Sequence, residues 1–559
     1  MMNYNTVLFL KVIIYVGLTV FTTLIVNAQS LSLGSHQILD DYYRREQLWS
    51  KLDSAVSFTI RPLSLSALGR DNMFYPDSTG DDRIYNKSIS SNPVKIDLLP
   101  FTSKVQFTSH HPYGWNDGLM IPNSGFQTLL SGGIYAQHKG FSLQLQPEMV
   151  MAENKRFRGF PEEYQIETWA LVYDYYYNLI DAPEQYGNGK YTRLNWGQSS
   201  IRYNYKQLSV GLSTENLWWG PGRRSSLLMS NNAPGFKHLT FNTSRPIHTP
   251  IGSIETQLIV GRLENSGFAP PGADSLLYGT AIYKPKNASY RDISGFIFTY
   301  QPKWLKGLFL GYARTAQNYS GKTIARPFLL PFKRFNYNKA KDEDRDYDQY
   351  LAFFGRWIFS EAHGELYFEY GLNNHPYELD QPKGDPGHSR AYTFGLRKFV
   401  PTKNAKTQFL IDLEITQLSG PADYLSKGGE SWYVHDRVRQ GYTHKGEILG
   451  AGIGTGGNLQ SLTVSRVQGL NRLGLQLERH VRNNDLLFYA IQDYRRHWVD
   501  LSMAINADRV YKNFILNGSL QAIKSLNYQY YLENVPGVFW VKGRDIVNIQ
   551  ATLGLAYRL

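Results

Sequence analysis

Hydrophobic and polar residues alternate along the end of the chain, in the stretch VNIQATLGLAYRL. One set of alternate positions is mostly apolar and consists of Val547, Ile549, Ala551, Leu553, Leu555, Tyr557 and Leu559, and the other consists of Asn548, Gln550, Thr552, Gly554, Ala556 and Arg558. Because successive side chains of a β-strand point to opposite faces, this period predicts a strand with one face suited to lipid and one suited to water. The run is long enough to cross a membrane as a tilted strand, which takes about nine to eleven residues.

The same alternation recurs upstream in pairs of segments joined by short connections, including a predicted turn at 506–509. Much longer segments separate the pairs, as expected of a barrel with short periplasmic turns and long outer loops. The pattern predicts an all-β fold, a transmembrane antiparallel up-and-down β-barrel of about eighteen strands, an even number as in single-chain bacterial barrels. The predicted strands are residues 95–108, 126–137, 141–149, 196–204, 208–215, 238–245, 252–263, 296–301, 308–314, 351–357, 366–370, 392–398, 407–417, 462–464, 473–477, 499–505, one ending near Lys524, and 547–559.

The first residues have a different pattern. Lys11 precedes the apolar run 12–26, and Val26 and Ala28 supply the small residues of a cleavage site. This arrangement predicts a secretory signal peptide over residues 1–28, cleaved near Ala28. The alternative is a retained anchor helix, for which the apolar run is short.

Residues 29–94 lack the strand pattern and precede the first predicted strand. Ser35 is a candidate N-cap for a helix with acidic residues in its early turns and basic residues later, as the helix dipole prefers. The apolar stripe of that helix consists of Ile38, Tyr42, Leu48, Trp49 and Leu52. We predict a small helical periplasmic plug over 29–94 that closes the lower mouth of a barrel formed by residues 95–559. The alternative is a helical leader that lies loose in the periplasm.

Composition narrows the possible functions. Aromatic residues make up 14% of the chain, including 40 tyrosines, which is typical of proteins whose rings lie at membrane interfaces or against sugars. The absence of cysteine excludes disulfide scaffolds and thiolate metal sites. The formal net charge of +12 comes from basic residues scattered among 47 acidic ones, so no nucleic-acid partner is predicted.

Three clusters of aromatic and polar residues fall in predicted outer loops. Their rings are suited to stack on sugar faces, and their amide and guanidinium groups to bond hydroxyls or to pair with uronate or phosphate groups. The candidate polysaccharide-binding residues are Trp115, Asn116, Asp117, Trp218, Trp219, Arg223, Arg224, Asn231, Asn232, Trp432, Tyr433, His435 and Tyr442. The alternative for the loop at 216–237 is structural: its tryptophans pin the loop to the barrel wall, and its arginines pair with inward carboxylates such as Glu148 or Glu414.

Catalytic signals are weak. His110, His111, His435 and His444 lie in outer loops near serines and carboxylates, but no G-x-S-x-G nucleophile motif occurs. The glycine-rich segment GAGIGTGG at 450–457 is not followed by the Lys and Ser or Thr of a phosphate-binding loop. Adjacent histidines would face opposite sides of a strand and cannot share a metal. We therefore predict no enzymatic activity, no metal and no cofactor.

Several long motifs, in order along the chain, carry a family resemblance. They are HPYGWNDGLMIPNSG, ENLWWGPGRRSSLLMSNNAPGF, ELYFEYG, HSRAYTFGL, WYVHDRVRQGYTHKGEILGAGIG and RNND. With them the chain resembles the capsule assembly Wzi family of outer-membrane proteins, in the form common in Bacteroidetes-type bacteria. The resemblance implies an eighteen-stranded outer-membrane barrel, a small N-terminal helical plug and a lectin-like role in holding capsular polysaccharide at the cell surface.

The implied location is the outer membrane of a Gram-negative bacterium, and the implied partners are capsular or extracellular polysaccharide and outer-membrane lipid. Thr552, Gly554, Tyr557 and Leu559 resemble the terminal signal of barrel proteins, which predicts contact with the barrel assembly machinery during biogenesis. We expect a monomer. The competing functions are a diffusion channel and, further from the pattern, a barrel hydrolase.

Overall fold

The structure is a computed structural model of the full chain, and it describes residues 29–53, 55–69, 72–76, 88–91, 94–319, 346–373, 390–403, 407–420, 431–533, 541 and 543–559. The predicted signal peptide, residues 1–28, lies outside the described residues. None of the described helices has the length and apolar character needed to cross a bilayer.

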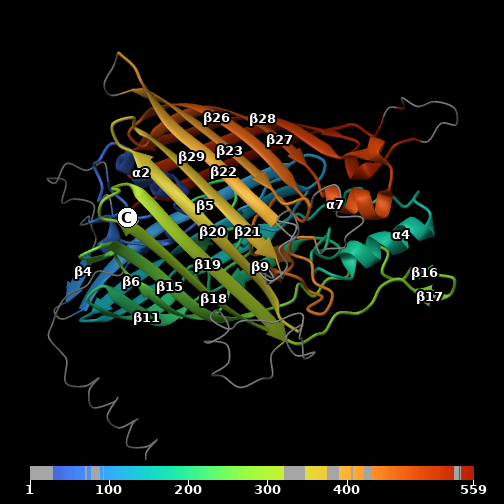
Figure 1. Ribbon diagram of the computed structural model, residues 1–559, viewed down its shortest axis with the longest axis horizontal. Helices are drawn as coiled ribbons and strands as arrows, with labels where there is room; N and C mark the ends of the chain where they lie inside the picture. Colours follow the sequence, from blue (N-terminus) through green and yellow to red (C-terminus); the bar gives the residue numbers. More distant parts are fainter. Residues whose placement is uncertain are drawn as a thin grey trace, which may run out of the picture.

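The alternating segments form one antiparallel sheet that closes on itself. Closure occurs where the first long strand pairs with the last, with Phe101 opposite Tyr557 and Thr108 opposite Gln550. When three interrupted strands are each counted as one, the described residues form a closed barrel of 18 strands (Figure 1). In chain order these are β5 (Val94–Thr108), β6 (Gly125–His138), β7 (Phe141–Leu145) with β8 (Glu148–Ala152), β9 (Tyr191–Asn195) with β10 (Ser200–Tyr205), β11 (Leu208–Ser213), β13 (His238–Thr243) with β14 (Ile247–Thr249), β15 (Gly252–Leu263), β18 (Arg291–Pro302), β19 (Leu308–Tyr319), β20 (Asp348–Phe359), β21 (Gly364–Asn373), β22 (Arg390–Pro401), β23 (Gln408–Gln417), β26 (Asn458–Gln468), β27 (Asn471–Val481), β28 (Val499–Tyr511), β29 (Phe514–Leu526) and β30 (Ile546–Tyr557).

The predicted fold class is confirmed, and each predicted strand falls on one of these strands. One predicted turn is wrong. Residues 506–509 lie inside β28, where Asp508 bonds to Arg472 of the neighbouring strand, and the chain reverses instead between Tyr511 and Phe514. Asn506 and Asp508, which suggested a turn, belong to the inward half of an alternating strand, and Arg509 lies on its outer face.

The two faces of the wall differ as the alternation predicts. Leu475 and Leu477 point outward and are exposed, whereas Glu478 between β26 and β28 is 5% exposed and faces the lumen. An ionised side chain on the lipid face would cost about 2–4 kcal/mol near mid-membrane for a basic residue, so this pattern fixes which face each residue occupies.

A short N-terminal unit lies inside the barrel at the end where the strands are joined by short turns. Its helix α2 (Gln37–Leu48) contacts those turns, since Arg45 donates to the Gly469 carbonyl at 2.8 Å. Around it lie β1 (Ser30–Leu31), β2 (Ile60–Arg61), β3 (Leu63–Ser64) and α3 (Leu65–Leu68), and β4 (Ser88–Ser91) pairs with β5. Figure 1 shows α2 and the C-terminus at this end of the barrel.

The helix differs in detail from the prediction. It begins after His36 rather than Ser35, and neither residue's side chain caps it in the way expected. Its polar side is buried as well as its apolar side, because Asp41, Arg44 and Gln47 face the polar inner wall. A helix enclosed by a polar barrel has no side that faces solvent. The predicted apolar stripe therefore accounts for only part of the buried surface of α2.

The opposite end of the barrel carries the long loops. The short elements of these loops are α4 (Ile166–Val172), η2 (Tyr173–Tyr177), α7 (Asn484–Leu486), η5 (Leu487–Ile491), η6 (Tyr494–Arg496), η7 (Tyr528–Tyr530), β12 (Trp218–Trp219), β16 (Leu276–Leu277), β17 (Thr280–Ala281), β24 (Thr443–His444) and β25 (Glu447–Ile448). Of these, β12 lies inside the lumen, where it pairs with β2. Figure 1 places α4, α7 and the β16–β17 hairpin at this end, away from α2.

Candidate functional site

The loop between β11 and β13, residues 214–237, turns into the lumen and meets the N-terminal unit. Its β12 pairs with β2, so that Trp218 lies opposite Arg61 and Trp219 opposite Ile60. The Arg61 guanidinium stands 4.6 Å from the Trp218 ring centre. Trp219 Nε1 donates to Gln257 Oε1 of the wall at 2.8 Å. The two tryptophans therefore join the loop, the N-terminal unit and the wall.

The arginines of this loop pair with protein carboxylates. Arg223 forms ion pairs with Asp41 of α2 and with Asp412 of β23, the latter at 3.0 Å. Arg224 pairs with Glu478 at 2.8 Å. Glu414 accepts hydrogen bonds from the backbone N–H groups of residues 223, 224 and 225 at 2.8–3.0 Å. The structural alternative expected the loop arginines to pair with inward carboxylates such as Glu414. Glu414 does hold the loop, but it binds backbone N–H groups and not the arginine side chains.

Glu148, the other carboxylate considered, has a different partner. Its Oε1 accepts a hydrogen bond from Gln198 Nε2 at 3.2 Å, and Gln198 in turn donates to Asn216 Oδ1 at 2.9 Å. This carboxylate supports the start of the loop rather than its arginines.

A second inward segment, residues 431–457, packs against the first. Tyr433 bridges the two, because its hydroxyl donates to the Leu227 carbonyl at 2.8 Å and accepts from the Ala451 N–H at 2.8 Å. Tyr442 donates to Thr315 Oγ1 of the wall at 2.9 Å. His435 accepts two backbone N–H groups of its own turn through Nδ1. Trp432 is 1% exposed.

A third inward segment follows β5. Trp115 Nε1 and Asn116 Nδ2 both donate to the Arg224 carbonyl, at 3.1 and 2.8 Å, and the Arg224 guanidinium covers the Trp115 ring. Asn231 donates to the Asn116 carbonyl at 2.8 Å. Three loops therefore share one packed interior.

Two polar contacts complete this interior. Asp117 forms an ion pair with Lys104 of the wall. Asn232 Nδ2 donates to the Ile448 carbonyl at 3.0 Å. Every predicted sugar-contacting residue thus has a protein partner or a buried place in the lumen.

The sugar-binding role expected for these rings stays a prediction, and the structure shows what surrounds them. Those of Trp115, Trp218, Trp219, Trp432, Tyr433 and Tyr442 are all buried. A ring covered on its faces by protein has no surface for stacking on a sugar. The amides and arginines beside them are likewise engaged within the lumen, so the described structure supports a bracing role for these clusters.

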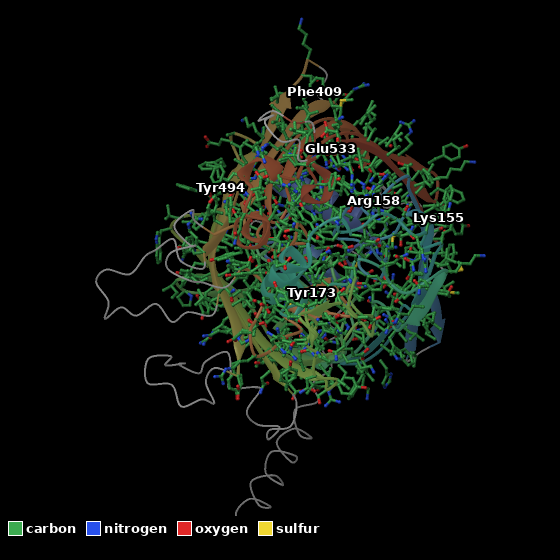
Figure 2. All side chains as sticks on the ribbon, turned by 90° about the vertical axis from the view of Figure 1, so that its right-hand side faces the viewer. Lys155, Arg158, Tyr173, Phe409, Tyr494 and Glu533 are labelled. Carbon is green, nitrogen blue, oxygen red and sulfur yellow. The ribbon has the colours of Figure 1, made fainter. Side chains whose placement is uncertain are left out.

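A separate hollow opens at the loop end of the barrel, where the sequence indicated no site. It lies between the segment 157–188, which includes α4, and the segment 268–275. Figure 2 views this end of the barrel, with Tyr173, which follows α4, near the centre. The aromatic residues that line the hollow are Phe157, Phe160, Tyr164, Trp169 and Phe268. We call it the outer cleft.

Polar groups stand among the rings of the outer cleft. Glu184 accepts hydrogen bonds from the Tyr177 hydroxyl at 2.7 Å and from the Phe160 N–H at 3.2 Å. Burial raises the pKa of Glu184 above its ordinary value, although these hydrogen bonds act in the opposite direction. Gln185 Nε2 is buried and, among the described residues, has no hydrogen-bond partner. Asn188 is exposed at the rim.

Sequence reasoning missed this cleft because its walls come from two loops about a hundred residues apart. The signal was present in two stretches, FRGFPEEY at 157–164 and DAPEQYGNG at 181–189, which also mix rings with amides and acids. Neither contains the paired tryptophans that made the lumen loops conspicuous.

The pair of His111 and Ser525 is not arranged as a hydrolase nucleophile and its base. His111 Nε2 lies 3.3 Å from Ser525 Oγ, but that hydroxyl is fully buried and donates to Asp500 at 2.6 Å. A nucleophile must be reachable by substrate and must have its acceptor on the base. Within the described ranges, no three His, Asp or Glu side chains gather as metal ligands.

Together the fold and the lumen define a class: a closed transmembrane β-barrel whose interior is occupied by its own N-terminal unit and inward loops. Residues 123–317 match the family model of capsule assembly protein Wzi, which confirms the resemblance recognised in the sequence. Among curated proteins, no match is found.

One solved structure with a TM-score above 0.5 shows the same fold. Wzi from Escherichia coli, described as an outer-membrane protein involved in group 1 capsule assembly and as a carbohydrate-binding β-barrel, aligns with a TM-score of 0.60 at 12% identity. The alignment covers 95% of this chain and 100% of that chain. OccK8 (OprE) from Pseudomonas aeruginosa covers 84% of this chain and 98% of its own, at 8% identity and a TM-score of 0.39. The alignment with OccK7 (OpdD) from the same organism covers 83% of this chain and 99% of that chain, at 9% identity and a TM-score of 0.37.

Proposed function

We propose that this protein is a lectin-like barrel of the outer membrane that binds capsular or extracellular polysaccharide and helps to assemble or anchor it at the cell surface. The family match over residues 123–317 and the description of Escherichia coli Wzi as carbohydrate-binding support this function. The observation that carries it is the outer cleft, an aromatic-walled hollow at the loop end of the barrel.

In this proposal the polysaccharide lies along the outer cleft. Phe157 and Phe268 are partly exposed, so their rings can pack on the apolar faces of sugar residues. Tyr164 is also partly exposed, but its ring stacks on Phe160 and is covered by the Arg496 guanidinium. Asn188 offers an exposed amide for hydroxyls, and Gln185, whose Nε2 is buried without a partner in the free protein, reaches a hydroxyl by rotation of its side chain. The lumen clusters hold the loops that form the cleft.

The cellular setting follows from the same proposal. A signal peptide cleaved near Ala28 brings the chain to the periplasm, and the C-terminal strand is presented to the barrel assembly machinery. The apolar outer wall then contacts membrane lipid, and the protein acts as a monomer. Its role is binding rather than catalysis, and the filled lumen argues against a diffusion channel.

The test uses the purified full barrel in detergent and a soluble capsular polysaccharide, with affinity measured by titration calorimetry. Phe268→Ala and Phe157→Ala are each expected to weaken binding about tenfold, since loss of a ring contact is worth about 1.4 kcal/mol. Tyr278→Ala is the matched control, because Tyr278 is an aromatic residue of the same loop region that is 88% exposed and outside the cleft.

Two outcomes contradict the proposal. One is that Phe268→Ala and Phe157→Ala bind the polysaccharide as tightly as the parent protein does. The other is a large, steady single-channel conductance in planar bilayers, which is the behaviour of a diffusion channel.

A further inference from the structure

One sector of the outer wall, formed by β27 to β30, carries an apolar face that ends in basic residues. The exposed residues of this face, from mid-wall to the loop end, are Leu473, Leu475, Leu477, Leu501, Met503, Ile505, Leu520, Val547 and Ile549. At the loop end of the same strands, Arg479 and Lys524 are also exposed on the outside.

The two basic residues stand in one cross-strand row. Arg479 lies opposite Leu501, Leu501 lies opposite Lys524, and Lys524 lies opposite Val547. Because neighbouring strands are about 4.8 Å apart, the two cations project from positions about 10 Å from each other. The row therefore alternates basic and apolar side chains.

A groove runs directly beneath this row. It is shallow and open to the membrane side, and it is lined by Leu477, Glu478, Leu501, Ser502, Met503, Ala522, Ile523, Lys524 and Val547. Glu478 and Ser502 are buried on the lumen side of the wall, and the exposed side chains of the groove are apolar apart from Lys524, so the groove accepts a hydrocarbon chain.

The charge at the head of the groove is incompletely balanced by the protein. Among the described residues, Arg479 has no carboxylate at ion-pair distance, and its Nη1 donates to Gln460 Oε1 at 2.9 Å. Lys524 has one carboxylate, Asp545, at 3.5 Å, and half-exposed pairs of this kind contribute little. The row thus offers net positive charge to a ligand at the membrane interface.

We propose that this groove is a binding site for a phosphorylated glycolipid of the outer leaflet, with an acyl chain in the groove and a phosphate group at Arg479 and Lys524. The position of the basic row at the loop end, with the apolar groove directly beneath it, identifies the occupant. Basic residues at the head of an apolar surface bind anionic lipid headgroups, whereas an apolar groove alone accepts any chain. The proposal rests on the outer-membrane location proposed above, but not on polysaccharide binding.

The experiment measures lipid retention on the purified full barrel by native mass spectrometry. The probe is diphosphoryl lipid A added to the protein in a non-ionic detergent, and a second arm uses the same lipid after removal of both phosphates. The variants are Arg479→Gln and Lys524→Gln, singly and together. The matched control is Arg509→Gln, which removes an exposed basic residue from the outside of β28 at the short-turn end.

We expect each site variant to reduce the one-to-one adduct about fivefold, in line with about 1 kcal/mol per basic residue near a charged lipid surface. Arg509→Gln should retain as much diphosphoryl lipid A as the parent protein. Retention of the dephosphorylated lipid should be the same for the site variants and the parent protein. Equal retention by the double variant and the parent protein overturns the site. An equal loss in Arg509→Gln also overturns it, because the effect would then be one of net charge. Neither result bears on glycan affinity, so the two proposals fail separately.

Discussion

The lumen loops and the outer cleft are built from the same kinds of residue but present them differently. In the loop 214–237, Trp219 is 2% exposed and its Nε1 bonds to the wall. In the outer cleft, Phe268 is partly exposed, and Gln185 Nε2 has no partner among the described residues. The first set of groups is already satisfied by protein, whereas the second keeps an exposed ring surface and an amide nitrogen without a protein partner.

The comparison shows that composition alone does not separate binding from bracing. Rings beside amides and guanidinium groups suit sugar, but they suit a packed polar interior equally well. What separates the two regions is where each hydrogen bond goes and whether a ring face remains uncovered. The predictions below address this difference.

The largest effect is expected at the contact between the wall and the N-terminal unit. Glu365→Leu leaves two buried guanidinium groups, Arg44 and Arg356, without the carboxylate that both contact. The expected loss is about 3–5 kcal/mol of unfolding free energy. It is measured by chemical denaturation in detergent micelles.

Glu361→Leu is the control for this change, because Glu361 lies four residues earlier in the exposed turn. A stability of Glu365→Leu equal to that of the control would show that the lumen contacts do not brace the barrel.

A smaller loss of stability is expected where two lumen loops meet. Tyr433→Phe removes a hydroxyl that serves as both donor and acceptor, and it leaves the Leu227 carbonyl and the Ala451 N–H buried without that partner. The cost should be about 1–3 kcal/mol. Thermal unfolding checks it, with Tyr278→Phe as the exposed counterpart. Glycan affinity of the folded fraction should stay unchanged, and a selective loss of affinity would return this cluster to the binding site.

The reverse pattern is expected in the outer cleft. Gln185→Leu replaces an amide whose Nε2 has no partner among the described residues, so stability should change by less than about 0.5 kcal/mol. Affinity for the polysaccharide should fall about five- to tenfold, the effect of one lost hydrogen bond to ligand. A variant that loses stability but keeps its affinity would reverse the assignment of the two regions.

The smallest effect concerns pH. Burial raises the pKa of Glu447, in the loop 431–457, to about 8, so the folded protein holds a proton there that the unfolded chain releases above its ordinary pKa. The contribution of Glu447 to the free energy of unfolding therefore falls as pH rises from about 4.5 to about 8. Glu447→Gln should be more stable than the parent at pH 9, by on the order of 1 kcal/mol, and nearly equal at pH 5. An identical pH profile for both proteins would contradict the buried, protonated carboxyl.

The barrel could be predicted from sequence because lipid and water impose their preferences on alternate residues. Phe409 and Asp412 of β23 are assigned to opposite faces by solvent alone, without knowledge of any partner. The enclosed helix was predictable from its apolar positions for the same reason. Its buried polar side was not, because Arg44 meets Glu365 across 321 residues of sequence.

For the loop 216–237 the sequence left both sugar contact and bracing against the wall open, because no local rule says whether a loop faces the medium or the lumen. Trp218 finds its partner in Arg61, and Trp115 finds Arg224, through pairings that only the closed barrel brings together. The outer cleft was missed for a related reason, since each of its two walls is unremarkable without the other.

The loop 214–237 also has a geometric consequence for the wall. Its contacts reach Gln257 on β15, Glu369 on β21, Asp412 on β23 and Glu478 on β27, which are strands on different sides of the lumen. A slip of any of these strands by two residues would preserve its inside-outside alternation yet carry its polar group away from the loop. Registers that differ by two residues place the same side chains toward lipid and toward water, so the alternation alone does not choose among them. The loop therefore selects one register, and this register sets the strand tilt and the diameter of the barrel.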